Sequence, residues 1–139
     1  MKTAPPSITN SLQTQLSANK TSLVMGDRIQ LSFSVVNASE RPAQFCRYMT
    51  PFEGFCGNIL QVRDIKGNML PYAGVLKKRG EPGPTDFYKL DPFSARSVEF
   101  NLHDAYPMRQ AGTYRIQFKG NASMNGLPDS NILEITVLE

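Results

Sequence analysis

The feature that most constrains the fold is the run at residues 28–36, in which polar and apolar residues alternate with a period of two. Its apolar members are Ile29, Leu31, Phe33 and Val35. In a β-strand successive side chains point to opposite faces, so this alternation buries one face and leaves the other in water. The run therefore predicts a strand that covers a hydrophobic core.

Shorter alternating or apolar stretches recur along the chain, and turn residues separate them. We expect them at residues 12–16, 43–48, 58–76, 87–90, 95–102, 112–118 and 132–138, with 58–76 forming a strand pair about Lys66, Gly67 and Asn68. The pattern has no helical period beyond a short turn at 102–106. It predicts an all-β fold, an antiparallel immunoglobulin-like Greek-key β-sandwich of seven to nine strands.

Two single residues refine this fold prediction. Tyr114 follows Gly112 at the head of a strand, where immunoglobulin-like folds place a corner tyrosine that bonds an upstream backbone group. Pro71 has no amide donor, so the second strand of the 58–76 pair should lie at an edge or be interrupted there.

Composition fits one domain and excludes some classes of partner. The 139 residues are 40% hydrophobic, enough for one core, and we expect a flexible leader at 1–10 and a single domain at 11–139. The net charge is +3, and the cations are scattered apart from residues 77–79, which argues against nucleic-acid binding. No apolar run approaches the 18 residues of a membrane span.

Cys46 and Cys56 lie ten residues apart, across a loop that contains proline and glycine. Such a loop allows two strand ends to approach, so the pair forms either a disulfide or two buried thiols, and the spacing favours the disulfide. A metal site is not expected, because two thiols and one distant histidine, His103, do not make a ligand set.

The sequence predicts no catalytic site and no cofactor. His103 is followed by Asp104, but neighbouring residues on a turn point apart, and the chain has no Gly-x-Ser-x-Gly nucleophile turn. Zinc peptidase chemistry needs two histidines one helical turn apart, and this chain has one histidine. We therefore expect a protein that is not an enzyme by itself.

A series of short motifs lies between about residues 20 and 120. They are 26–37 (Gly-Asp-Arg-Ile-Gln-Leu-Ser-Phe-Ser-Val-Val-Asn), 50–53 (Thr-Pro-Phe-Glu), 71–79 (Pro-Tyr-Ala-Gly-Val-Leu-Lys-Lys-Arg), Pro82, 86–88 (Asp-Phe-Tyr), 102–106 and 111–120. In their order and spacing these motifs resemble the N-terminal, non-catalytic region of deuterolysin-type zinc metalloendopeptidases. The His-Glu-x-x-His helix of that family's catalytic half is absent from this chain.

The resemblance implies a secreted or periplasmic, propeptide-like domain that inhibits a zinc metalloendopeptidase, assists its folding, or does both. An inhibitor of this kind needs a rigid sandwich whose loops reach the partner. Two loops fit, at 46–56 and 77–84. The candidate contact residues are Thr50, Pro51, Phe52, Glu53, Lys77, Lys78 and Arg79.

The alternative is a free-standing immunoglobulin-like module, extracellular or periplasmic, that binds a protein or glycan through one sheet face. Its expected signature is an exposed aromatic patch. The residues that would form this patch are Phe52, Phe55, Tyr72 and Phe87.

Overall fold

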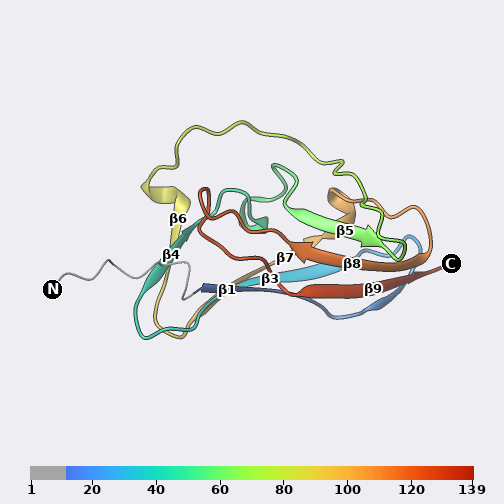
Figure 1. Cartoon of the computed structure of the whole chain (residues 1–139), viewed down its shortest axis with the longest axis horizontal. Coiled ribbons are helices and arrows are strands. Elements are labelled where there is room, and N and C mark those ends of the chain that lie inside the picture. Colours follow the sequence, from blue (N-terminus) through green and yellow to red (C-terminus); the bar gives the residue numbers. More distant parts are fainter. Residues whose placement is uncertain (1–11) are drawn as a thin grey trace.

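A computed structural model describes residues 12–139, so the predicted leader at 1–10 lies outside the described residues. This part of the chain holds nine strands and three short 3-10 turns (Figure 1). In order they are β1 Leu12–Ala18, β2 Ser22–Val24, β3 Gln30–Asn37, β4 Ala43–Cys46, η2 Pro51–Glu53, β5 Leu60–Asp64, η3 Pro84–Asp86, β6 Phe87–Leu90, β7 Ala95–Asn101, η4 Leu102–Asp104, β8 Gly112–Phe118 and β9 Ile132–Leu138.

The strands form a three-stranded sheet in the order β1-β3-β7, a four-stranded sheet in the order β2-β9-β8-β5, and a separate β4-β6 ribbon. All pairs are antiparallel except β2 with β9. In immunoglobulin nomenclature the first sheet, β1-β3-β7, corresponds to strands A, B and E. In the second sheet, β5, β8 and β9 correspond to strands C, F and G. These are the strand orders of an immunoglobulin-like Greek key. The predicted fold class is confirmed.

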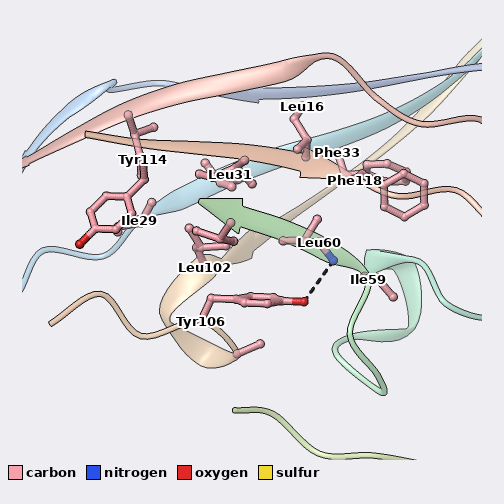
Figure 2. Packing of buried hydrophobic residues seen from close by; sticks show 14 of the residues in the cluster. Leu16, Ile29, Leu31, Phe33, Ile59, Leu60, Leu102, Tyr106, Tyr114 and Phe118 are labelled. Atoms are coloured by element: carbon pink, nitrogen blue, oxygen red, sulfur yellow. Dashed lines mark hydrogen bonds between the residues drawn. The ribbon is translucent and has the colours of Figure 1, made fainter. Parts of the chain in front are cut away.

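The core lies between the two sheets, and β3 contributes its predicted face. Leu31, Phe33 and Val35 are all fully buried, as are Ile116 and Phe118 of β8 in the other sheet. The Phe33 and Phe118 rings lie 4.6 Å apart between centroids (Figure 2). Each such side chain stabilises the fold by about 1.5–3 kcal/mol relative to exposure, so the alternation seen in the sequence holds the sheets together.

Tyr114 occupies the corner position that the sequence predicts. Its hydroxyl donates a 2.6 Å hydrogen bond to the carbonyl oxygen of Gln110, four residues upstream. The ring is buried at the start of β8, so this bond fixes the turn that leads into the strand.

Replacing Tyr114 with phenylalanine is expected to lower the free energy of unfolding by about 0.5–1.5 kcal/mol, the net contribution of one hydrogen bond. Tyr88→Phe is the matched control, because the Tyr88 hydroxyl makes no hydrogen bond within residues 12–139. Urea unfolding of both variants measures the difference. Equal stabilities would show that the Tyr114 bond contributes nothing.

The predicted strand pair at 58–76 is only half correct. The turn forms as expected, with Gly67 at φ 89°, but β5 has no full partner strand beyond it. Pairing is limited to a bridge between Arg63 and Met69 and two flanking backbone bonds, from the Asp64 amide to the Asn68 carbonyl and from the Leu70 amide to the Val62 carbonyl. The next residue is Pro71, which has no amide to continue the ladder. The sequence also did not reveal β2, whose three residues are too few to show alternation.

Candidate docking surface

After Leu70 the chain leaves the sheet as an irregular strap, residues 71–83, which runs along the outside of the molecule to η3. Figure 1 shows it as the green-to-yellow arch at the top. Two backbone hydrogen bonds fix it to the body: the Ala73 amide donates to Ala105, and the Lys77 amide donates to Cys56 at 3.0 Å. The strap therefore has a defined position although it has no regular structure.

The end of the strap is anchored by Arg79, whose guanidinium points into the body. It forms an ion pair with the carboxylate of Glu53, donates to the Cys56 sulfur at 3.2 Å, and stacks 4.7 Å from the centroid of the Tyr48 ring. The Glu53 side chain is only 2% exposed. A charge buried this deeply needs partners, so the Arg79 pair ties the strap to η2.

Glu53 belongs to a wider network of charges below the strap. Its other oxygen accepts from the Met49 amide at 2.8 Å, and Arg47 lies 3.6 Å away. Arg47 in turn binds Asp86 at 2.7 Å, and Asp86 also accepts from the Tyr48 hydroxyl at 3.1 Å. Two arginines and two carboxylates thus link the loop after β4, η2, η3 and the strap.

The surroundings of Asp86 favour its charged form. Its carboxylate accepts the Gly83 amide at 2.9 Å, and this bond, followed by those from Arg47 and Tyr48, holds the pKa of Asp86 below its usual value. The network is therefore intact when Asp86 is ionised, and it weakens as the pH falls through that lowered pKa.

Five of the predicted contact residues lie inside this network or under it, and Arg79 is one of them. Thr50 is fully buried and caps η2 by accepting from the Phe52 amide. Pro51 is buried, and the Phe52 ring packs 5.8 Å from that of Phe33. Together with Glu53 these side chains hold the loop in place and do not project from it.

Of the seven candidates, only Lys77 and Lys78 have exposed side chains. They follow two apolar residues that the sequence reading did not select, Val75 at 59% and Leu76 at 79% exposed. We call residues 75–78 the apex of the strap. The sequence does contain a signal for this apex, because two adjacent aliphatic residues, Val75 and Leu76, interrupt a stretch that is rich in glycine, proline and charged residues.

Cys46 and Cys56 are free, buried thiols, so the disulfide that their spacing favoured is not formed. Each sulfur has partners of its own. The Cys46 sulfur accepts from the Tyr48 amide at 3.4 Å, and the Cys56 sulfur contacts the Glu53 carbonyl at 3.7 Å as well as Arg79. Burial raises the pKa of the Cys46 thiol, which disfavours the reactive thiolate.

We expect Cys46 and Cys56 to react slowly with a thiol reagent in the native protein and to yield two thiols after denaturation. The melting temperature should be the same with and without reductant, because there is no cross-link to lose. Thiol titration and thermal melts test this. A reductant-dependent fall of several degrees would instead establish the disulfide.

His103 has a structural contact. Its Nδ1 lies 3.4 Å from the Met108 amide, whose hydrogen bond it accepts, and so ties η4 to the segment that follows. Within residues 12–139 no three His, Cys, Asp or Glu side chains come close enough to hold a metal ion. In the same residues no helix is long and apolar enough to cross a membrane.

Comparison with known proteins leaves the family open. No family model matches the sequence, and no curated protein matches it. Among solved structures, the chain is similar to part of the β-glucosidase EmGH1 from Erythrobacter marinus, with 20% identity and a TM-score of 0.49 over 92% of this chain. It is also similar to part of a β-glucosidase from Listeria innocua, with 14% identity and a TM-score of 0.45. The chain spans only 15% and 16% of the lengths of these enzymes, and the similarity carries no functional argument.

Proposed function

We propose that this chain is a non-catalytic domain that docks on a partner protein through the apex of the strap, residues 75–78. The observation that supports this is the combination of an exposed apolar pair with two exposed lysines on a strap that buried contacts hold in place. An exposed apolar group gains most from burial by a partner. A segment that is already fixed loses little conformational entropy on binding.

The charge of the apex defines the kind of partner. Lys77 and Lys78 lie beside Leu76 and have no ion pair within residues 12–139. The complementary surface is an apolar pocket with an acidic rim, and the charges speed encounter and set orientation. The resemblance to the N-terminal region of deuterolysin-type peptidases makes the catalytic domain of such a zinc endopeptidase the first partner to test, with inhibition or assisted folding as the outcome of docking.

The alternative, recognition through an aromatic patch, has less support. Three of the four rings that would form the patch pack against other rings: Phe52 lies 5.5 Å from Tyr88, Phe55 lies 5.4 Å from Phe100, and Tyr72 packs on Tyr106. None of the predicted patch residues is among the exposed large hydrophobic side chains of residues 12–139.

The test is a titration of a purified deuterolysin-type catalytic domain with this chain, with a thermolysin-type enzyme as the specificity control. The variant Leu76→Ser/Lys77→Glu is expected to bind at least about tenfold more weakly, because it removes one buried side chain and reverses one charge. Ile65→Ser/Lys66→Glu is the matched control, since Ile65 is 78% exposed and also precedes an exposed lysine.

Equal binding by the apex variant would contradict docking through the apex. Absence of binding and of inhibition for every deuterolysin-type peptidase, together with no gain in its refolding yield, would contradict the proposed partner.

A further inference from the structure

Two of the long sheet edges in the described residues are covered. Along β1, the Asn131 side chain accepts from the Leu16 amide at 2.8 Å and donates to the Leu16 carbonyl at 3.0 Å, as a neighbouring strand would. Along β5, Leu70 pairs with Val62 and Asn68 pairs with Asp64. Exposed edges are sites of unwanted strand pairing, and proteins commonly protect them in such ways.

Within residues 12–139, no backbone hydrogen bond covers the outer edge of β7. The bonds from the Asn37 amide to Ser94 and from the Leu102 amide to Ile29 identify the hydrogen-bonded pairs of the β3-β7 ladder. Because these pairs alternate along an antiparallel ladder, residues 94, 96, 98, 100 and 102 face β3. The amides and carbonyls of Ala95, Ser97 and Glu99 therefore point away from it, and no backbone bond joins them to another segment of residues 12–139.

The charged residues of β7 do not block this edge. Arg96 folds against the molecule, with its guanidinium 3.8 Å from the centroid of the Tyr88 ring. Glu99 lies on the outer face of the sheet, where it accepts from the Gln30 side chain of β3 at 3.4 Å. A charged side chain protects a sheet edge by projecting across it. Arg96 and Glu99 do not do so, because Arg96 contacts Tyr88 and Glu99 contacts Gln30.

An open groove of about 640 Å³ lies along the second half of β7. It is lined by Glu99 and Phe100 of β7 and by Phe55, Gly74 and Val75 from neighbouring segments. The Phe55 and Phe100 rings are in edge contact, with 5.4 Å between their centroids. The groove therefore offers an apolar wall beside a row of unpaired backbone groups.

The charge of the groove points to the chemistry of its occupant. Glu99 and Asp104 line it together with a single cation, Arg28, and neither acid forms an ion pair within residues 12–139. The net charge of one negative unit favours a basic side chain. Strand addition of this kind uses backbone bonds for affinity and alternate side chains for specificity.

We propose that the free edge of β7 binds an extended segment of another protein as an additional strand, with aliphatic side chains toward Phe55 and Val75 and a lysine or arginine toward Glu99. In the added strand, the residues directly opposite Ala95, Ser97 and Glu99 point to the same outer face of the sheet as these three. They therefore carry the basic side chains, and they also make the backbone bonds to β7. The aliphatic residues alternate with them. The site shares Val75 with the apex but none of its lysines, and it does not depend on the proposed function.

The probe is the capped peptide Thr-Val-Lys-Val-Lys-Val-Thr, carrying a fluorophore for anisotropy. We expect saturable binding to the full chain. Methylation of the backbone nitrogens of both lysines should lower affinity at least about tenfold, because it removes donors to β7 and leaves the side chains in place. A peptide with glutamates in place of the lysines should bind more weakly, and Glu99→Lys should reverse that preference.

Ser97→Pro removes the amide that points to the free edge and leaves the β3 ladder intact, since residue 97 does not bond β3. Ser97→Ala is its matched control, because both variants lose the 2.7 Å contact between the Ser97 and Ser34 hydroxyls. We expect Ser97→Ala to bind like the unchanged chain and Ser97→Pro to lose at least about tenfold in affinity. A thermal melt shows whether each variant is folded. If Ser97→Pro does not fold, the comparison of the methylated and unmethylated peptides tests the proposal instead.

Equal binding of the methylated and unmethylated peptides would overturn strand addition. So would equal binding by folded Ser97→Pro and Ser97→Ala. Sedimentation of the unchanged chain adds a further test: a dimer that Ser97→Pro converts to monomer would show that a second copy, and not a basic segment of another protein, occupies the edge.

Discussion

Replacing Glu53 with alanine is expected to lower the free energy of unfolding by about 3–5 kcal/mol, which is the usual cost of breaking a buried ion pair from one side. The loss is large because the Glu53 side chain is 2% exposed and serves Arg79, Arg47 and the Met49 amide together. Without it, the Arg79 guanidinium lies under the strap with no carboxylate. Urea denaturation of the variant and the unchanged chain measures the loss.

A double-mutant cycle identifies the anchor as the cause. Arg79→Ala alone should also destabilise the fold, and the double variant should be less unstable than the sum of the two single changes, with a coupling of about 0.5–3 kcal/mol. Glu134→Ala is the surface control, because the Glu134 pair with Arg115 is mostly exposed and contributes about 0–1 kcal/mol. Additive effects of the Glu53 and Arg79 changes would contradict the anchor.

Replacing Tyr106 with phenylalanine is expected to lower the free energy of unfolding by about 1–3 kcal/mol at neutral pH, because the buried Leu60 amide loses the only acceptor it has within residues 12–139. Tyr106 is fully buried, and its hydroxyl accepts the Leu60 amide at 3.1 Å (Figure 2) while donating to the Asn58 side chain. The variant keeps the ring and its packing on Phe55 and Tyr72. A stability equal to that of the unchanged chain would show that water replaces the lost bond.

The effect of Tyr106→Phe should depend on pH. Burial raises the pKa of Tyr106 to about 12, above its ordinary value of 10.0. The unfolded chain therefore loses this proton first, and the stability that the neutral hydroxyl provides is present below pH 10 and is lost as the pH rises toward 12. The stability gap between the two proteins should narrow by about 1 kcal/mol from pH 8 to pH 11. A gap that stays constant would contradict the raised pKa.

The parts of the fold that were predictable depend on local periodicity. The strand around Phe33 and the corner at Tyr114 were correct, because alternation and a strand-initial tyrosine are visible in a few consecutive residues. The strand expected after Asn68 ends at Pro71, where the missing amide donor predicted an edge or an interruption. No local pattern shows that the segment beyond it, with Val75 and Leu76, lies outside the core.

The location of the candidate site could be predicted from the sequence, but the roles of its individual residues could not. Both loops selected from the sequence do meet, but a sequence pattern does not show that Arg79 turns inward to Glu53, 26 residues away, while Lys77 and Lys78 stay exposed. The cysteine pair shows the same limit. The spacing of Cys46 and Cys56 allowed a disulfide. In the structure the Cys46 sulfur accepts from the Tyr48 amide instead, and the Cys56 sulfur accepts from Arg79.

The measurement that tests the central claim most directly is hydrogen exchange of this chain, alone and with a deuterolysin-type catalytic domain. In the free chain the amides of Val75, Leu76 and Lys78 donate no hydrogen bond within residues 12–139 and should exchange fast. Docking through the apex predicts that the partner slows exchange at residues 75–78 and leaves η2 unchanged. Protection that appears elsewhere, with residues 75–78 still exchanging at the free rate, would contradict the account.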